Sequence, residues 1–399
     1  MELGQTDRVH ALRLKVNAFV SELIVPAEPR YQAELGQDRW SEPAVLAELK
    51  DRTRQADLFD LYAALPQMTH VEMAHLSEPL GASELAPHVF NCGPQDAGNL
   101  ELLTRYGDAQ QQALYLQPLR DGAIRSAFAM TEPSVASSDA GNLATTARLE
   151  GDERIIQGEK SWVTGAGDPR CGMIVVLCVT NPGAELHERQ SLLLVPMQTQ
   201  GLSIQAMQPV FGYDDAPHGH AQLRFDEVRV PRAALIGRAS EGLALIQDRM
   251  SRSRIRNCMR SIGAAERALA LLIERSKSRT AFGRPLRDLG GNAGLIADCR
   301  IDIELTRMMA LRAAWTLDAH GLDAALGAIA QMKVAVPART LAVIDRAIQL
   351  HGGTGVSDDT PLARMWATHR ALRLSDGPDD VHRELIARLE TGAPEQAYF

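Results

Sequence analysis

The sequence predicts a mainly α protein with a central β domain, and three observations support this. Residues 1–125 and 238–399 carry apolar residues every three or four positions, which is typical of amphipathic helices. Residues 126–237 instead contain short β-branched runs broken by Gly, Asn, Asp and Pro, which is typical of strands. The length of 399 residues suits two or three domains. We therefore expect an N-terminal helical domain, a middle β domain and a C-terminal helical domain with these boundaries.

The individual elements follow from the same patterns in chain order. Helical spacing in the first segment predicts helices at residues 43–49, 57–65 and 69–80. Short apolar runs predict strands at residues 154–156, 173–179, 191–195 and 202–204, and strict alternation predicts a one-face-buried strand at 221–230. Helical spacing returns at residues 262–275, 297–317 and 326–350. Pro337 is expected to kink or break the last of these helices.

Charge and hydropathy exclude several classes of protein. Lys and Arg together number 42 and Asp and Glu 50, which gives a net charge of −8 and argues against nucleic-acid binding. No apolar run approaches the roughly 20 residues of a membrane-spanning helix, so we expect no membrane span. The first 20 residues also lack the apolar stretch of a signal peptide.

Cysteine and histidine spacing gives no sign of a disulfide framework or a metal site. The five cysteines are scattered, odd in number and free of any C-x-x-C pair, so we expect reduced thiols and a cytoplasmic location. His218 and His220 lie two residues apart, and their interpretation as residues of a loop or strand start is favoured over metal ligation.

Two stretches of the middle segment carry candidate chemistry. Residues 127–139 read AFAMTEPSVASSD, and residues 160–165 read KSWVTG. Their backbone amides and short hydroxyls could hydrogen-bond the polar edge of a flat heteroaromatic ring while the indole packs on its face. The alternative interpretation is a turn at Thr131-Glu132-Pro133 with solvent-facing serines.

Three further stretches lie in the C-terminal segment, and each has an ordinary structural explanation. Residues 279–285, RTAFGRP, fit either a helix C-terminus or a phosphate-binding Arg beside an aromatic residue. Residues 349–355, QLHGGTG, fit either helix capping or a backbone that a ligand can approach closely. Residues 374–382, LSDGPDDVH, fit a helix start with Pro378 at the first helical position and Asp376 or Gly377 as the cap.

Taken together, these stretches resemble the acyl-CoA dehydrogenase family, and most closely the subgroup of family members 10 and 11. Five motifs occur in the family's order across nearly the whole chain: T-E-P at 131–133, W-[IV]-[ST] at 162–164, R-x-x-F-G at 279–283, Q-x-x-G-G-x-G at 349–355 and an acid-Gly pair at 376–377. The resemblance implies an N-terminal helical domain, a middle β-barrel and a C-terminal four-helix bundle.

The resemblance also implies a flavoprotein that oxidises an acyl-CoA thioester to its trans-2-enoyl form. Asp376 would be the base that takes the α proton, its amide would help to hold the developing enolate, and flavin N5 would accept a hydride. An electron-transferring flavoprotein would accept the electrons, and the subunits would form a homotetramer or homodimer. The alternative function is a flavin-dependent oxidase of the same superfamily, either nitroalkane-oxidase-like or an acyl-CoA oxidase.

Site residues follow from the resemblance position by position. Contacts to FAD are expected from Phe128, Met130, Thr131, Ser138, Trp162, Val163 and Thr164. Contacts to the FAD of a neighbouring subunit are expected from Arg279, Phe282, Gln349, Gly352 and Gly353. Contacts to the substrate are expected from Ser138, Ser251, Arg254 and Gly377.

Three departures from the family pattern affect these assignments. Most members carry Glu where this chain has Asp376, so the base is one methylene shorter. Pro378 and Asp380 replace the usual polar residues after the acid-Gly pair, and Pro378 has no N–H to donate. The segment after T-E-P is one residue longer than usual, which leaves Ser137 and Ser138 as alternatives for the same contact.

Overall fold

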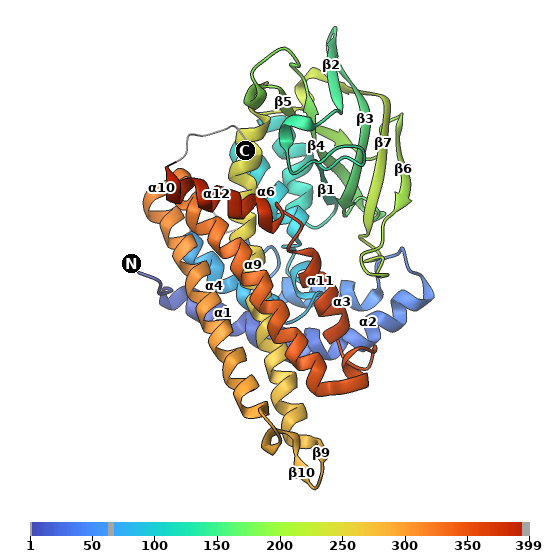
Figure 1. Ribbon diagram of the computed structural model, residues 1–399. Coiled ribbons are helices and arrows are strands. Elements are labelled where there is room, and N and C mark those ends of the chain that lie inside the picture. The colour runs from blue at the N-terminus through green and yellow to red at the C-terminus, as the bar shows by residue number, and fades with distance from the viewer. Residues whose placement is uncertain (1, 63–67, 393–399) are drawn as a thin grey trace. The chain divides into compact units, whose positions relative to one another are not determined.

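The computed structural model describes residues 2–62 and 68–392, and the chain divides into two compact units (Figure 1). We call the first the helical unit; its described residues come from 1–26, 64–86 and 254–393. We call the second the β unit; its described residues come from 27–63 and 87–253. The three-domain division expected from the sequence stays a prediction.

The β unit is built on an eight-stranded sheet whose path is β6-β7-β3-β2-β4-β5-β8, with β1 paired to β4. The strands are β1 (Arg125–Ala129), β2 (Thr146–Glu150), β3 (Glu153–Thr164), β4 (Cys171–Val179), β5 (Gln190–Pro196), β6 (Leu202–Met207), β7 (His220–Pro231) and β8 (Leu235–Ile236). Neighbours are mostly antiparallel, but β4 runs parallel to both β1 and β2. All five predicted strands are confirmed, and β1, β2 and β8 were not predicted.

Strand β4 shows why its sequence is apolar throughout. Ile174, Val176 and Cys178 pack with other strands, in a cluster that includes Phe225 of β7. The alternate residues of β4 pack on the opposite face, against a cluster that includes leucines of nearby helices. Because both faces of β4 are buried, the strand reads as a continuous apolar run instead of an alternating one.

Helices of the β unit lie before the sheet in the chain. They are α2 (Val25–Gln37), α3 (Ala44–Gln55), α5 (Ala86–Val89), α6 (Pro94–Tyr106), α7 (Ala109–Gln111) and α8 (Gln117–Arg120). The helix predicted at 43–49 is confirmed by α3.

The helix predicted at residues 57–65 is wrong for the part that the structure describes. Residues 57–62 form turns, with Asp57 and Asp60 at φ 55°, and residues 63–65 lie outside the described residues. Leu58 and Leu61 are nevertheless buried, and their backbone N–H groups donate to Thr53 and Phe90. The apolar residues therefore belong to a buried turn, and its backbone N–H groups donate to residues outside the segment 57–62.

The helical unit is a bundle with a small hairpin. It contains α1 (Asp7–Phe19), α4 (His70–Leu80), most of α9 (Gly242–Ser278), the hairpin β9 (Thr280–Ala281) and β10 (Arg284–Pro285), α10 (Asn292–His351), α11 (Leu362–Ala371) and α12 (Asp379–Thr391). The N-terminus of α4 is a capping box in which Thr69 and Glu72 bond each other's backbone N–H, so the helix predicted at 69–80 is confirmed. The main core joins side chains of α4, α9, α10 and α11.

Helix α10 continues through Pro337, so the predicted kink is in the wrong place. Pro337 and the neighbouring Val336 are buried, and this packing offsets the roughly 3 kcal/mol that an internal proline costs. The helical path is interrupted at Gly321 instead, where φ is 81° and ψ is −177°. Only glycine adopts that backbone conformation readily.

The stretch Asn292–Gly355, which contains α10, is long and apolar enough by composition to cross a membrane, with a hydropathy of 1.2 in its most apolar window. Of that window, 56% is buried inside the protein. The core helix of a bundle meets the same criterion, so the feature is weak evidence for a span.

Candidate active site

The T-E-P segment and strand β3 are joined directly within the β unit. The backbone N–H of Ser161 donates to the carbonyl of Thr131 at 2.8 Å, and the Lys160 ammonium donates to the carbonyl of Met130 at 2.9 Å. Met130 is partly buried and Thr131 is exposed. The two motifs that the sequence separates by about 30 positions therefore form one edge, where predicted flavin contacts lie side by side.

A buried ion pair fastens this edge. The Lys160 ammonium, fully buried, lies 2.8 Å from a Glu132 oxygen, and the Glu132 carboxylate also accepts the N–H groups of Ala144 and Thr145. Burial lowers the pKa of Lys160. Burial acts to raise the pKa of Glu132, but Lys160 and the two backbone donors outweigh it and the pKa is lowered. The glutamate of T-E-P is thus a structural anchor, a role that the turn interpretation of the sequence did not identify.

Trp162 presents its indole to solvent from an unusual backbone conformation. Its φ is 56°, in the left-handed region, and 48% of the residue is exposed. The Gln208 side-chain oxygen accepts both the Trp162 N–H and the Ser161 hydroxyl, which holds this conformation. An exposed indole kept in a costly conformation is typical of a ligand-contacting residue.

Next to Trp162, the Thr164 hydroxyl lies 2.8 Å from Nδ1 of His220, whose Nε2 lies 2.7 Å from Asp215. His220 begins β7, which confirms its interpretation as a strand-start residue. In the described part of the chain, no group of three or more His, Cys, Asp or Glu side chains is placed to hold a metal ion.

The structure distinguishes the two candidate serines. The Ser137 hydroxyl accepts the Glu132 N–H at 2.8 Å and closes the turn from within, whereas Ser138 is exposed. Of the remaining flavin contacts, Val163 is fully buried in the β core, so only its backbone is available to a ligand. Phe128 is partly buried, with the Arg249 guanidinium 4.1 Å from the centre of its ring.

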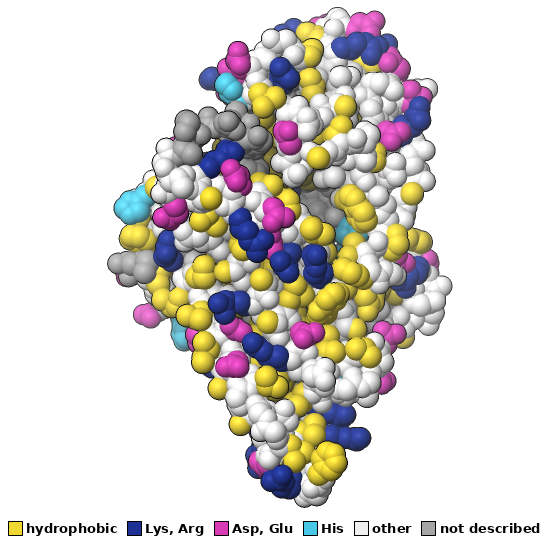
Figure 2. Space-filling view, viewed as in Figure 1, with side chains coloured by type: hydrophobic (Ala, Val, Ile, Leu, Met, Phe, Trp, Pro, Cys, Tyr) yellow, Lys and Arg dark blue, Asp and Glu magenta, His cyan; other side chains and the backbone are white. Residues whose placement is uncertain are grey.

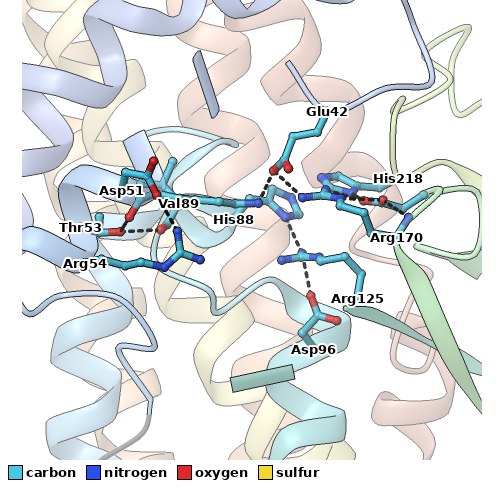
Figure 3. A network of polar contacts seen from close by, with 12 residues as sticks. Glu42, Asp51, Thr53, Arg54, His88, Val89, Asp96, Arg125, Arg170 and His218 are labelled. Atoms are coloured by element: carbon cyan, nitrogen blue, oxygen red, sulfur yellow. Dashed lines mark hydrogen bonds and ion pairs between the residues drawn. The ribbon is translucent and has the colours of Figure 1, made fainter. Parts of the chain in front are cut away.

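A polar network includes Arg125, the first residue of β1 (Figure 3). Asp96 accepts the Ser126 N–H and pairs with Arg125 at 2.6 Å, and Arg125 in turn donates to Nδ1 of His88 at 3.0 Å. The ring of His88 stacks on that of His218 at 4.0 Å. This network fixes the start of the strand that carries Phe128, and sequence spacing alone gave no sign of it because its members come from four separate segments.

Burial favours the uncharged form of the two stacked histidines. His218 Nδ1 lies 3.0 Å from Asp168, which also pairs with Arg170. Burial is the largest cause lowering the pKa of His88 and of His218, and Arg125 lowers both further. Because Arg125 can only donate, Nδ1 of His88 must be the unprotonated nitrogen.

Ser251, a predicted substrate contact, lies in α9 with its hydroxyl fully buried. Its Oγ has no hydrogen-bond partner among the described residues. A buried polar atom without a partner is uncommon and calls for an explanation.

The predicted base Asp376 lies in the loop between α11 and α12 of the helical unit. It is partly buried, with φ 57°. Its Oδ2 accepts the Asn257 amide at 2.9 Å, and its backbone carbonyl accepts the Arg254 Nε–H at 2.9 Å and lies 3.2 Å from Nε2 of His382. The structure therefore brings together Arg254, Gly377 and Asp376, and it adds Asn257 and His382 beside them.

Gly377 is required by this geometry. Its φ is 96°, and a Cβ built there would lie 2.9 Å from Nε2 of His382. The loop is also anchored at its start, where the fully buried Lys333 donates to the carbonyl of Leu372 at 2.6 Å. Pro378 is the N-cap of α12 and not its first helical residue, so the helix begins one residue later than predicted. Neither Asp376 nor Gly377 therefore caps the helix.

The remaining predicted cofactor contacts of the helical unit are exposed. Phe282, 95% exposed, forms the tip of the β9–β10 hairpin beside exposed Arg279, and hydrophobic and basic side chains meet at that end in Figure 2. Gln349, Gly352 and Gly353 are exposed where α10 ends, and a Cβ on either glycine would meet nothing within 4 Å. These residues are free to contact a ligand.

Two family models match successive parts of the chain. The acyl-CoA dehydrogenase middle-domain model matches residues 127–228, and the C-terminal-domain model matches residues 240–390. The chain is 44% identical to the Mycobacterium tuberculosis protein named probable acyl-CoA dehydrogenase FadE2, covering 98% of this chain and 97% of that one.

Two longer relatives carry the names that the motifs suggested. Acyl-CoA dehydrogenase family member 10 of Mus musculus is 42% identical over 97% of this chain, which spans 37% of its length. Family member 11 of Homo sapiens is 41% identical over 97% of this chain, which spans 50% of its length. The resemblance to this family and subgroup is confirmed.

Solved structures share the fold. A Mycobacterium abscessus protein assigned to the acyl-CoA dehydrogenases superposes with a TM-score of 0.94 at 44% identity, covering 98% of this chain and 99% of that one. The acyl-CoA dehydrogenase of Geobacillus kaustophilus superposes with a TM-score of 0.81 at 23% identity, covering 97% and 98%. The predicted fold, mainly helical with a central β domain, is confirmed. Both domain models and a relative matched over nearly its whole length show that the chain belongs to the acyl-CoA dehydrogenase family and is an oxidoreductase.

Proposed function

We propose that the chain catalyses the FAD-dependent α,β-dehydrogenation of an acyl-CoA thioester to the trans-2-enoyl-CoA, with Asp376 as the base. One observation carries this proposal: Oδ2 of Asp376 is held by Asn257, whereas its Oδ1 has no hydrogen-bond partner among the described residues. A carboxylate with one oxygen pinned and the other free is suited to accept a proton. Family membership supports the reaction type.

The exposed residues of each unit fit the isoalloxazine ring and the phosphates of FAD. In the β unit, Trp162 offers a flat apolar face, and Thr131 and Ser138 offer exposed hydroxyls. In the helical unit, Arg279 and the Gly352–Gly353 backbone offer donors for phosphate. FAD, when bound, supplies a hydride acceptor at N5.

The chain's own residues perform the proton chemistry in this proposal. Asp376 Oδ1 takes the α proton, while the Asp376 backbone N–H donates to the thioester carbonyl and stabilises the negative charge that develops there. Arg254 and His382 both bind the Asp376 carbonyl and so hold the Asp376–Gly377 peptide unit that follows the base. We also propose that Ser251, Ser138 and Gly377 contact the acyl-CoA; the buried Ser251 hydroxyl would gain its missing partner.

The proposal extends to partners and location. We propose an electron-transferring flavoprotein as acceptor, a homotetramer or homodimer in which the Phe282 hairpin and the Gly352 loop reach a neighbouring subunit's FAD, and a cytoplasmic location. The extreme exposure of Phe282, 95%, supports a contact beyond its own subunit.

Asp376→Asn tests the assignment of the base. The amide keeps the shape of the side chain but accepts a proton poorly, so we expect a folded yellow protein whose flavin is not bleached by acyl-CoA under anaerobic conditions. Asp323→Asn, at an exposed position of α10, is the matched control and should be bleached like the wild type. Normal bleaching of the Asp376 variant would remove that residue from the mechanism.

A series of acyl-CoAs from short to very long chains should be tested in the same anaerobic assay, because it identifies the substrate class. Oxygen consumption with formation of peroxide, in the absence of any other acceptor, would show the oxidase reaction instead.

A further inference from the structure

Asn257 lies directly beside the proposed base and belongs to none of the motifs. It stands three residues after Arg254 in α9, so the two side chains project from the same face of the helix. Arg254 binds the backbone carbonyl of Asp376, and Asn257 binds its carboxylate through Nδ2 at 2.9 Å. One face of α9 therefore fixes both the peptide and the side chain of the same residue.

The direction of the contact is set by its chemistry. An ionised carboxylate can only accept hydrogen bonds, so the Asn257 amide must donate through its NH2 group. Oδ2 is the atom that accepts, and Oδ1 has no partner among the described residues. The two carboxylate oxygens, equivalent in a free aspartate, are thereby made different.

Backbone geometry makes such a restraint necessary. Asp376 has a left-handed φ of 57° and is followed by Gly377 at φ 96°, so the loop is held by its contacts and not by regular structure. An aspartate side chain has two rotatable bonds, and an unrestrained carboxylate would turn to expose either oxygen. A proton-abstracting group must be held in one orientation for an efficient transfer.

We propose that Asn257 is a positioning residue for Asp376: its side-chain amide fixes the carboxylate rotamer and leaves Oδ1 as the single proton-accepting oxygen. This inference rests on the proposed role of Asp376 as base. When the α C–H bond breaks, the proton forms its new bond at Oδ1, and Asn257 keeps its bond to Oδ2 without gaining or losing a proton.

Several other charged or titratable groups face the same carboxylate, and they do not replace Asn257. Arg254 and the buried Cys258 project from α9, Lys333 from α10 and His382 from α12. Arg254 and His382 contact only the backbone carbonyl, and Lys333 donates to Leu372. Burial, with Arg254 and Lys333, lowers the pKa of His382 to about 3, so His382 stays neutral and donates through Nε2.

The test compares Asn257→Ala, Asn257→Asp and Asn257→Gln in the full FAD-bound enzyme. Loss of one hydrogen bond to a charged group predicts a fall of about ten- to hundredfold in the rate of anaerobic flavin reduction by acyl-CoA, with KM within about twofold. The acid limb of the pH–rate profile should move to higher pH in Asn257→Ala, and further in Asn257→Asp because two carboxylates then share the site. Asn257→Gln keeps the donor and should recover part of the rate.

A second readout does not depend on turnover. In protein labelled with ¹³C at aspartate carboxyls, the signal that Asp376→Asn removes should titrate at higher pH in Asn257→Ala than in the wild type. Gln331→Ala is the matched control, because this amide of α10 contacts Arg312 and not the loop. If Asn257→Ala does not fold, the isosteric Asn257→Asp answers the question by the same titration.

The outcomes separate the two proposals. Flavin reduction that survives in Asp376→Asn would overturn the proposed function. An inactive Asp376→Asn together with an Asn257→Ala variant that has wild-type rate, pH profile and carboxyl titration would overturn only the positioning role. A rate loss without any change in the two titrations would reduce Asn257 to a general structural residue and would also overturn the inference.

Discussion

Gly377 shows how strongly one position of the loop is constrained at the scale of single residues. Its φ is 96°, which L side chains rarely adopt, and its missing Cβ leaves room for the His382 ring. Asp376 beside it also has a left-handed φ, which aspartate tolerates better than most residues. The acid-Gly pair is therefore a conformational unit as well as a chemical one.

We expect Gly377→Ala to lower the free energy of unfolding by about 1–3 kcal/mol, because alanine is strained at this φ and its Cβ meets His382. Urea unfolding followed by circular dichroism measures the change. Gly294→Ala is the control: it lies in α10 with nothing within 4 Å, so it should leave stability unchanged or raise it slightly. Equal stability of both variants would contradict the steric argument.

At this scale the sequence predicted the site only in part. The resemblance to the family pointed to Asp376, Gly377, Arg254, Trp162 and Thr131, whose roles stay predictions. Asn257 and His382 gave no such signal, since an asparagine in a helix and a histidine after an acidic turn are ordinary in composition. Their importance depends on their contacts with Asp376. Asn257 in α9 lies more than one hundred positions from Asp376 in the sequence, and His382 belongs to α12.

At the scale of elements, the hydrophobic periodicity predicted whether a segment is helix or strand better than it predicted where each element begins and ends. Strands with apolar β-branched runs, such as β4, were identified, whereas β1 and β2 read RSAFA and TARLE and carry no such run. Pro337 was a misleading signal because buried packing in α10 keeps the helix continuous there, and Gly321 was missed because one glycine in a helical pattern is usually tolerated. Tertiary contacts decided each of these cases.

The T-E-P loop and β3 depend on the Glu132–Lys160 pair. Glu132→Gln would leave the fully buried Lys160 ammonium without its counter-charge, and we expect a loss of about 3–5 kcal/mol in the free energy of unfolding. Differential scanning calorimetry of the variant measures it.

The double variant Glu132→Leu, Lys160→Met removes both charges and should recover much of that loss, because apolar residues of similar size can replace a buried pair. A double variant as unstable as Glu132→Gln would show that the backbone bonds to Glu132, and not the ion pair, hold the loop.

At the scale of the whole molecule, buried neutral histidines make stability depend on pH. Burial is the largest cause that lowers the pKa of His88, His218, His369 and His382 below 6.5. The unfolded chain therefore binds more protons than the folded one below about pH 6.5, so stability falls as the pH falls through that value.

When the pH falls from 8 to 5.5, each such histidine should lower the free energy of unfolding by up to about 1.4 kcal/mol. The four histidines together should lower it by several times that amount. Urea unfolding at the two pH values measures the difference. His218→Asn keeps a donor for Asp168 but does not titrate. The decrease in the free energy of unfolding between the two pH values should therefore be smaller by the contribution of one histidine. A wild type equally stable at both values would show that these rings are protonated in the folded state.

The Glu132–Lys160 anchor has a consequence for ligand binding. The loop from Met130 to Thr145 is tied down at its carbonyls, its turn and its carboxylate before any ligand arrives. The loop loses its conformational entropy during folding. If flavin binds at this edge as proposed, its binding free energy is therefore not reduced by the cost of ordering the loop.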